Sequence, residues 1–312
     1  MLGFRQLLDD VKNVVDGYNQ TDFVFTDTNE VPHISPQHTF GNGEEKKGEH
    51  IKTCVLYVDI RDSVKMTKQH TIEKMGTVFS AFSESVQMAA IRHNGHTRNI
   101  IGDRVMVVFP TDNCFKNAVD CAISINHLMK YVLNKKINGI DFQCGIGIDY
   151  GDMYSIKVGL PKQGAEREDN RRLVWIGTPA NFASRLTDNA NKEYSEIIYK
   201  VKNYFRRFSF KQLPTNGGNP ILQSRLQCCE EIMTGNEAIN SIIDGKSVHI
   251  EPVGQLKPYK YNPILISEEV FNGFQKECPN YNSVINKWWQ KETQKIKDIP
   301  YDVYGADLIW KM

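Results

Sequence analysis

Two aspartates lie within apolar, strand-like runs that meet charged residues. Asp59 lies in the run Thr53–Ser63, and Asp103 lies in the run Arg98–Phe109. A carboxylate inside a buried strand pattern is costly unless a cation compensates its charge. On neighbouring strands the two carboxylates could share Mg²⁺, which binds hard oxygen ligands and substrate phosphates, and two-metal sites suit in-line phosphoryl chemistry. The alternative is that each aspartate serves only a turn or a helix N-cap.

The residues around these aspartates contain turn signals. Arg61-Asp62-Ser63, directly after Asp59, predicts a tight turn from a strand into a helix. Backbone N–H groups at such a helix start point toward anions. Asn94-Gly95 is typical of a two-residue hairpin turn, and this hairpin leads to Gly102-Asp103. The turns strengthen the interpretation of the two aspartates as a ligand site.

A third element carries an amide and a guanidinium. Asn181 and Arg185 are four residues apart, so on a helix they share a face. Together such groups can hold a ribose oxygen and a triphosphate in a transition state. The alternative is an ordinary residue in the first helical turn and a surface cation.

Together these elements resemble the catalytic domain of class III nucleotidyl cyclases. The similarity implies an α+β fold in which helices cover an antiparallel-rich sheet. The motifs occur in the family's order, as Val55–Ile60, Gly102-Asp103, Cys144–Gly151 with Val158-Gly159, Gly177 with Asn181 and Arg185-Leu186, and Pro263–Phe271.

The resemblance also implies roles for individual residues. It assigns two metal ions per site, Mg²⁺ or Mn²⁺, to Asp59, Asp103 and the backbone carbonyl of Ile60. It assigns transition-state stabilisation to Asn181 and Arg185. Because these families work as head-to-tail dimers, the resemblance further implies a homodimer in which the metals and the Asn/Arg pair come from different protomers.

The chain departs from the purine-specific members at three positions. Asn99 stands where they place a lysine or a guanine-reading glutamate, and Val174 stands where adenylyl members often place an aspartate. Tyr57 replaces the usual phenylalanine, which adds bulk and a hydroxyl that needs a partner when buried. This pattern is similar to the pyrimidine cyclases of bacterial Pycsar anti-phage systems. The alternative is that Tyr57 is simply a good strand former.

The resemblance therefore predicts cyclisation of UTP, with CTP possible, to a 3′,5′-cyclic monophosphate. Its product would be a second messenger in anti-phage defence, sensed by a downstream effector. Base or substrate contacts are expected from Tyr57, Arg61, Ser63, Asn99 and Val174. Two alternatives remain open: an adenylyl or guanylyl cyclase, and a non-catalytic regulatory domain of the same fold.

Composition adds exclusions. The 312 residues carry a formal net charge of +1, so no nucleic-acid footprint is indicated. No apolar run is long enough for a transmembrane helix, and no signal peptide is visible. The seven cysteines are irregularly spaced, which favours a reducing cytoplasm over a disulfide framework. We therefore predict a cytoplasmic protein with no nucleic-acid or membrane partner.

Hydrophobic periodicity predicts the order of the elements. Residues 1–17 form an N-terminal helix, and residues 18–50 form a linker. The catalytic domain spans 51–191 and 263–312, interrupted by a helical insertion over 192–262. Within it we expect a strand over 51–62, helices over 72–94 and 118–132, a hairpin near 95–110, two strands or a hairpin over 141–159, a dimer-arm loop over 161–172, and a last strand pair over 299–310. Lys297 and Lys311 are the candidates for a phosphate-binding lysine.

Overall fold

The computed structural model describes residues 2–39, 45–159, 171–194, 197–211, 221–234, 249–255 and 259–311. The chain divides into two compact units. Unit 1 consists of Met1–Lys192 and Tyr261–Met312, and unit 2 consists of Glu193–Lys260. Unit 1 combines helices with a mixed, mostly antiparallel sheet, so the predicted α+β class is confirmed.

The described residues of unit 1 contain a nine-stranded sheet built around β2 (Lys46–Ile60) and β5 (Cys144–Gly159). These two long strands pair antiparallel from Glu49↔Ser155 to Ile60↔Cys144. The main path through the sheet is β13-β14-β12-β5-β2-β4-β3, with β1 beside β2 and β6 beside β5. The other strands are β1 (Phe23–Asp27), β3 (His96–Ile101), β4 (Arg104–Val108), β6 (Arg171–Ile176), β12 (Ile264–Ser267), β13 (Gln290–Lys291) and β14 (Val303–Ala306).

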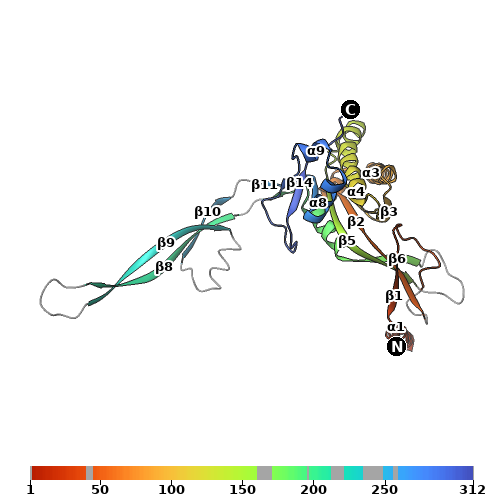
Figure 1. The fold of residues 1–312 in the computed structure, drawn as a ribbon, viewed down its shortest axis with the longest axis horizontal. Helices are drawn as coiled ribbons and strands as arrows, with labels where there is room; N and C mark the ends of the chain where they lie inside the picture. Colours follow the sequence, from red (N-terminus) through yellow and green to blue (C-terminus); the bar gives the residue numbers. More distant parts are fainter. Residues whose placement is uncertain are drawn as a thin grey trace. The chain divides into compact units, whose positions relative to one another are not determined.

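Helices cover both faces of this sheet (Figure 1). Alternate residues of β2, such as Leu56 and Val58, join a core with α3 (Ile72–Arg92), α4 (Cys114–Leu128) and α8 (Glu268–Glu277). The intervening residues, such as Val55, face a second cluster that includes Ala183 of α6 (Thr178–Asn189). Successive strand residues point to opposite faces, so β2 serves both clusters. The remaining helices are α1 (Leu2–Tyr18), α2 (Ser63–Gln69), the π-helix Met129–Leu133, α5 (Asn134–Lys136) and α9 (Asn282–Ile285).

Helix α3 shows why the predicted helices form. Thr71 precedes the helix and its side chain accepts a hydrogen bond from the Lys74 backbone N–H, which caps the first turn. Val78, Phe82 and Val86 then recur at intervals of four residues and are fully buried. The expected helix over 72–94 is therefore present and ends at Arg92.

Unit 2 consists of strands in its described residues. β8 (Ile197–Lys211) and β9 (Ile221–Thr234) pair antiparallel, and β10 (His249–Gln255) lies on the other side of β8. β7 (Glu193–Tyr194) and β11 (Tyr259–Lys260) form a separate pair. The expectation of a helical insertion is therefore wrong for these residues. Alternating aromatic and β-branched residues in β8, such as Tyr199 and Val201, favour strands, but the interleaved lysines and arginines obscure this pattern.

Three further expectations need correction. The segment 18–50 is not a linker throughout, because Phe23–Asp27 forms β1 and pairs parallel with the start of β2. Residues 144–159 form one continuous strand instead of two. The run 299–310 supplies only β14, whose partners are β12 and β13. The predicted dimer-arm loop lies mostly outside the described residues, between the paired strands β5 and β6.

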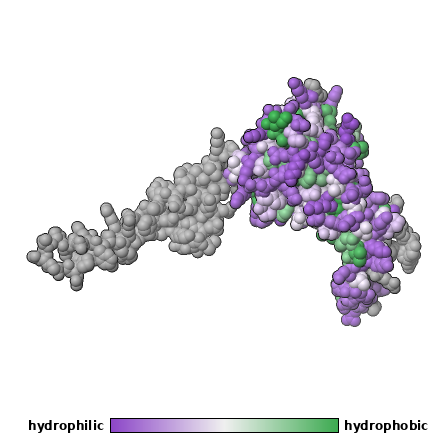
Figure 2. All heavy atoms as spheres, in the orientation of Figure 1, coloured by the Kyte–Doolittle hydropathy of each residue, from purple (hydrophilic) through white to green (hydrophobic). Residues whose placement is uncertain are grey.

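The surface and helices of the described residues give two further findings. Among these residues, no helix has the length and apolar character needed to cross a bilayer. The face drawn in Figure 2 is mostly hydrophilic, with hydrophobic residues in small, separate spots.

Asp149, in the middle of β5, makes stability depend on pH. The side chain is only 3% exposed, and burial raises its pKa from 3.8 to about 6. Between these two values the unfolded chain has released the proton while the folded chain retains it. Stability is therefore lost as the pH rises from about 4 to about 6.

We expect Asp149→Asn to remove this dependence. The stability of the variant relative to the wild type should increase between pH 4 and pH 7, by at most about 3 kcal/mol. Urea unfolding of both proteins at these two pH values measures the change. If the difference in unfolding free energy between the variant and the wild type is the same at both pH values, Asp149 is not the source of the pH dependence.

Candidate active site

Asp59 and Asp103 come together where β2 meets the β3–β4 hairpin. Asp59 is paired in register with Arg104, the first residue of β4. Asp103 precedes Arg104 in the hairpin turn, where Gly102 has a φ of +61°, a conformation that glycine adopts without strain. Burial raises the pKa of the Asp59 carboxyl, and the nearby negative charge of Asp103 raises it further. The structure thus brings the two predicted metal ligands close together.

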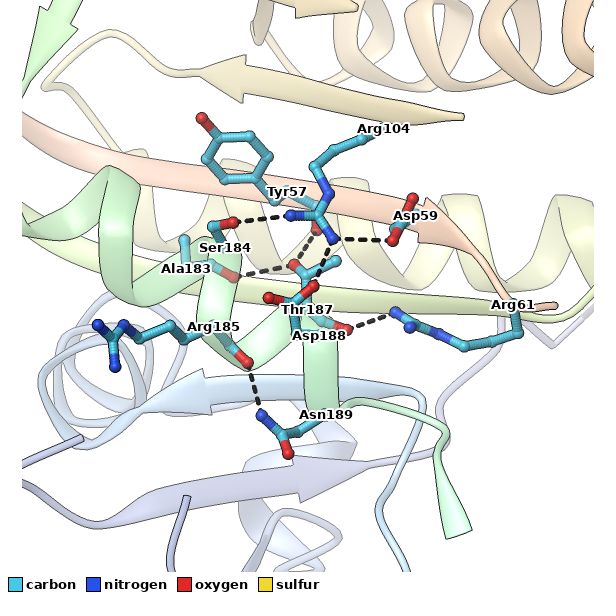
Figure 3. A network of polar contacts seen from close by, with 10 residues as sticks. All are labelled: Tyr57, Asp59, Arg61, Arg104, Ala183, Ser184, Arg185, Thr187, Asp188 and Asn189. Atoms are coloured by element: carbon cyan, nitrogen blue, oxygen red, sulfur yellow. Dashed lines mark hydrogen bonds and ion pairs between the residues drawn. The ribbon is translucent and has the colours of Figure 1, made fainter. Parts of the chain in front are cut away.

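Arg104 compensates the charge of Asp59. Its Nη2 donates to Asp59 Oδ2 at 2.9 Å and also to Asp188 of α6. Its Nη1 donates to Ser184 Oγ at 2.9 Å. Figure 3 shows this guanidinium between the end of β2 and α6. Arg104 lowers the pKa of Asp59 and opposes the effect of burial.

The carboxylates suit a divalent cation whose coordination is completed by substrate. Their mutual repulsion and partial burial favour a compensating positive charge, and carboxylate oxygens are preferred Mg²⁺ ligands. No group of three or more His, Cys, Asp or Glu side chains among the described residues could hold a metal alone. The Ile60 carbonyl follows Asp59 at the end of β2. The residues present therefore fit a metal that also binds triphosphate oxygens.

Asn181 and Arg185 lie on α6 but do not take part in the contacts that Ser184 and Asp188 make with Arg104. Both are exposed, and Arg185 forms an ion pair with Asp298. Ser184 and Asp188, by contrast, contact Arg104. The four residues are spaced as i, i+3, i+4 and i+7 and so share one broad side of the helix, but the Arg185 side chain reaches Asp298 instead of the Arg104 network. Figure 3 shows the Arg185 guanidinium directed away from Asp59. Within one chain, the structure does not bring Asn181 and Arg185 to the carboxylates.

Two of the predicted substrate contacts lie at the turn after Asp59. Arg61 is 8% exposed, and its Nη2 donates to the backbone carbonyl of Thr187 near the end of α6. In this arrangement the guanidinium ties α6 to the sheet. Ser63 is the first residue of α2 and is half-buried. Asp62, which precedes it, has a left-handed φ of 57° and makes no side-chain cap.

The three predicted base contacts lie in three different surroundings. Tyr57 is half-buried, and burial raises the pKa of its hydroxyl. Its ring packs against the cluster between the sheet and α6. Asn99 is exposed on β3 and lines a pocket with Leu173 and Trp175 of β6. Val174 is 41% exposed and is not part of the pocket lining; it lies on the opposite face of β6 from Leu173 and Trp175.

The remaining residues are outside these contacts or were missed from the sequence. Lys297 and Lys311 are both exposed. Sequence reasoning missed Arg104, Ser184 and Asp188. Arg104 follows Asp103 directly, and the antiparallel pairing of β4 with β2 places it opposite Asp59, so this register was the signal that pointed to it. Ser184 and Asp188 are four residues apart on α6 and so share a face.

Comparison with known proteins identifies the family. The adenylate and guanylate cyclase catalytic domain matches residues 45–218, more than half of the chain. The chain therefore belongs to this family and is a nucleotidyl cyclase, which confirms the class III resemblance. Cyclases of this class bind nucleoside triphosphates and use divalent metal ions.

Individual relatives are more distant. A uridylate cyclase from Burkholderia cepacia is 28% identical over 208 residues, covering 63% of this chain and 86% of the relative. A cytidylate cyclase from Staphylococcus aureus is 30% identical over 187 residues, covering 56% of this chain and 43% of the relative. The adenylyl cyclase CyaB from P. aeruginosa superposes with a TM-score of 0.46 at 16% identity, over 83% of this chain and 94% of that chain.

Proposed function

We propose that this cyclase converts a pyrimidine nucleoside triphosphate, UTP in preference to CTP, to the 3′,5′-cyclic monophosphate and pyrophosphate. The observation that carries the proposal is the set of side chains at the base-reading positions. Asn99 and Val174 stand in place of the purine-reading pair, and Tyr57 stands in place of phenylalanine. Relatives named uridylate cyclase and cytidylate cyclase, at 28% and 30% identity, support the same choice.

The reaction is an intramolecular displacement. The ribose 3′-hydroxyl attacks the α-phosphorus, its proton leaves, and the bond to the pyrophosphate oxygen breaks. Two divalent cations, Mg²⁺ or Mn²⁺, bound by Asp59, Asp103 and the Ile60 carbonyl, would lower the pKa of the hydroxyl and neutralise developing charge. Arg185 stabilises the charge on the α-phosphate, and Asn181 orients the ribose. Arg61 and Ser63 belong to the turn beside the phosphates.

The active protein is proposed to be a homodimer with shared sites. In one chain the Arg185 guanidinium points away from Asp59 and pairs with Asp298, and Asn181 is exposed. A head-to-tail partner would supply the missing half of each site. This arrangement accounts for the exposure of two polar side chains whose proposed role requires contact with substrate.

The proposed setting is bacterial anti-phage defence in the cytoplasm. The cyclic pyrimidine nucleotide would act as a second messenger for a separate sensing effector. The motif similarity to pyrimidine cyclases of Pycsar systems supports this setting. Neither a nucleic acid nor a membrane is needed for the reaction.

Comparison of the four nucleoside triphosphates tests the proposal. We expect UTP or CTP to be cyclised at least about tenfold faster than ATP and GTP, because a buried polar group left unpaired by the wrong base costs about 1–3 kcal/mol. Chromatographic measurement of products under matched Mn²⁺ and Mg²⁺ conditions gives the four rates. Faster turnover of ATP or GTP than of both pyrimidines would refute the pyrimidine assignment and favour an adenylyl or guanylyl cyclase.

Variants of Tyr57 separate the bulk of this side chain from its hydroxyl. If bulk excludes purines, Tyr57→Ala should relax selectivity more than it slows UTP turnover. Tyr57→Phe is the matched control, since it keeps the ring and removes only the hydroxyl. A protein with no detectable turnover of any of the four triphosphates would instead point to a non-catalytic domain.

A further inference from the structure

The pocket beside Asn99 contains several cationic side chains, and none of the described residues that line it carries a carboxylate. It has a volume of about 570 Å³ and brings together three segments distant in sequence. Pro32–Ile34 precedes β2, Thr97–Asn99 belongs to β3, and the third wall comes from β6. His33, Arg98, Arg171 and Arg172 supply hydrogen-bond donors, while Trp175 supplies an aromatic surface. A ligand for this pocket should therefore be planar and rich in acceptor atoms.

A β-bulge brings Arg98 into this pocket. In the pairing of β3 with β4, Thr97 lies opposite Val107 and Asn99 opposite Met106, so the register shifts between them. Arg98 is the extra residue in this bulge. Bulges re-aim side chains and are common beside active sites. Here the bulge allows both Arg98 and the predicted base-reading residue Asn99 to line one pocket.

The Arg98 guanidinium is fixed by one hydrogen bond, and most of its N–H groups have no acceptor among the described residues. Its Nη2 donates to the backbone carbonyl of Val31 at 3.3 Å, and this is its only hydrogen bond within the part of the chain that the structure describes. Its Nε is buried without an acceptor. Burial lowers the pKa of this guanidinium, and among the described residues no carboxylate opposes that effect. A partly buried cation without a counter-charge is costly, so a bound acceptor would stabilise it.

Uracil fits these donors better than cytosine does. Arginine has donors only, whereas the amide of Asn99 can donate or accept. Uracil offers a carbonyl oxygen at position 4 and an N–H at position 3, which Arg98 and Asn99 can bind together. Cytosine has an amino group at position 4, and its N–H groups would face the N–H groups of Arg98 with no acceptor between them. We propose that Arg98 is a specificity-determining residue that donates to the O4 carbonyl of uracil.

This inference rests on the proposed pyrimidine cyclase function and selects the base within it. Binding of 3′-deoxy-UTP, which cannot cyclise, provides a readout that is independent of turnover. Its counterpart is 3′-deoxy-4-thio-UTP, which keeps the N–H at position 3 and replaces the oxygen at position 4 with sulfur, a weaker acceptor. Titration calorimetry with wild type, Arg98→Gln and Arg98→Lys gives the dissociation constants. Arg92→Gln, at an exposed arginine outside the pocket lining, is the matched control for net charge.

The two ligands and the variants form a double-mutant cycle. The wild type should bind 3′-deoxy-UTP about tenfold or more tightly than its 4-thio analogue. Arg98→Gln should lose most of this preference, whereas Arg92→Gln should retain it. Arg98→Lys keeps the charge but not the planar fork, so it should restore the preference only in part. Thermal melting of each variant checks that the Arg98–Val31 contact is not required for folding.

Several outcomes would overturn the inference. Equal weakening of both ligands by Arg98→Gln would assign Arg98 a merely structural role. Equal weakening of inorganic tripolyphosphate would assign it to the phosphates. If Arg98→Gln instead removes a preference for 3′-deoxy-UTP over its 2-thio analogue, Arg98 binds the oxygen at position 2. Cytosine also has this oxygen, so Arg98 would not select uracil. If Arg98→Gln does not fold, the wild type alone still tests the inference. Equal dissociation constants of the wild type for the two ligands would refute it. Faster wild-type turnover of ATP or GTP, by contrast, would refute the proposed function itself.

Discussion

Asp59→Ala and Asp103→Ala should each abolish cyclisation while leaving the protein folded. Metal stabilisation of a phosphoryl transition state contributes several kcal/mol, so a loss of about a thousandfold or more is expected. Neither change opens a large cavity, because both side chains lie at the edge of the core. In Asp59→Ala, Arg104 keeps Asp188 as a partner and is not left without a counter-charge.

Asp188→Asn provides the matched control for this loss. It alters a carboxylate in the same hydrogen-bonded network but not a proposed metal ligand, so most activity should remain. Product formation from UTP with Mn²⁺ gives the rates, and thermal melting with size-exclusion chromatography reports folding and assembly. Near-normal turnover in either of the first two variants would show that the metal assignment is wrong.

A mixed dimer of two inactive variants should regain activity. If metals and Arg185 come from opposite protomers, a heterodimer of Asp59→Ala with Arg185→Ala contains one site with both defects and one intact site. Each verified heterodimer should therefore show about half of the wild-type turnover, because subunit mixing restores the full set of groups at one site. Co-expression with two different affinity tags isolates the heterodimer for assay.

The control for this experiment is a heterodimer of Asp59→Ala with Asp103→Ala. Both changes affect the metal-binding half of a site, so in this dimer every site lacks one ligand and no rescue is expected. Activity in the first heterodimer but not in the second would locate the boundary between protomers. Failure of the first, verified heterodimer to recover activity would indicate sites contained within one chain.

The elements predicted best from the sequence are those with strong local signals. The strand that ends at Asp59 and the hairpin that carries Asp103 follow from apolar runs and turn residues, and the structure contains both. The helix of Asn181 and Arg185 is also present as α6. These segments combine regular periodicity with a clear beginning and end, so local preference and tertiary packing agree.

Elements that depend on distant partners were missed. β1 is short and surrounded by polar residues, and only its pairing with β2 identifies it as a strand. The strands of unit 2 carry interleaved basic residues, which resemble the solvated face of a helix. At the site, the role of Arg104 depends on cross-strand register and on α6, and that of Arg98 depends on a bulge. No local pattern encodes these contacts, because they exist only once the segments are assembled.

The position of Arg104 has a consequence for communication between sites. This one guanidinium joins Asp59 to α6 through Ser184 and Asp188. A metal ion bound to Asp59 would weaken the ion pair between Asp59 and Arg104. The contact of Arg104 with α6 would then no longer be tied to β2. In the proposed dimer with shared sites, Asn181 and Arg185 of the same helix would serve the opposite active site. Filling one site would then alter the affinity of the other, and the coupling must be equal in both directions.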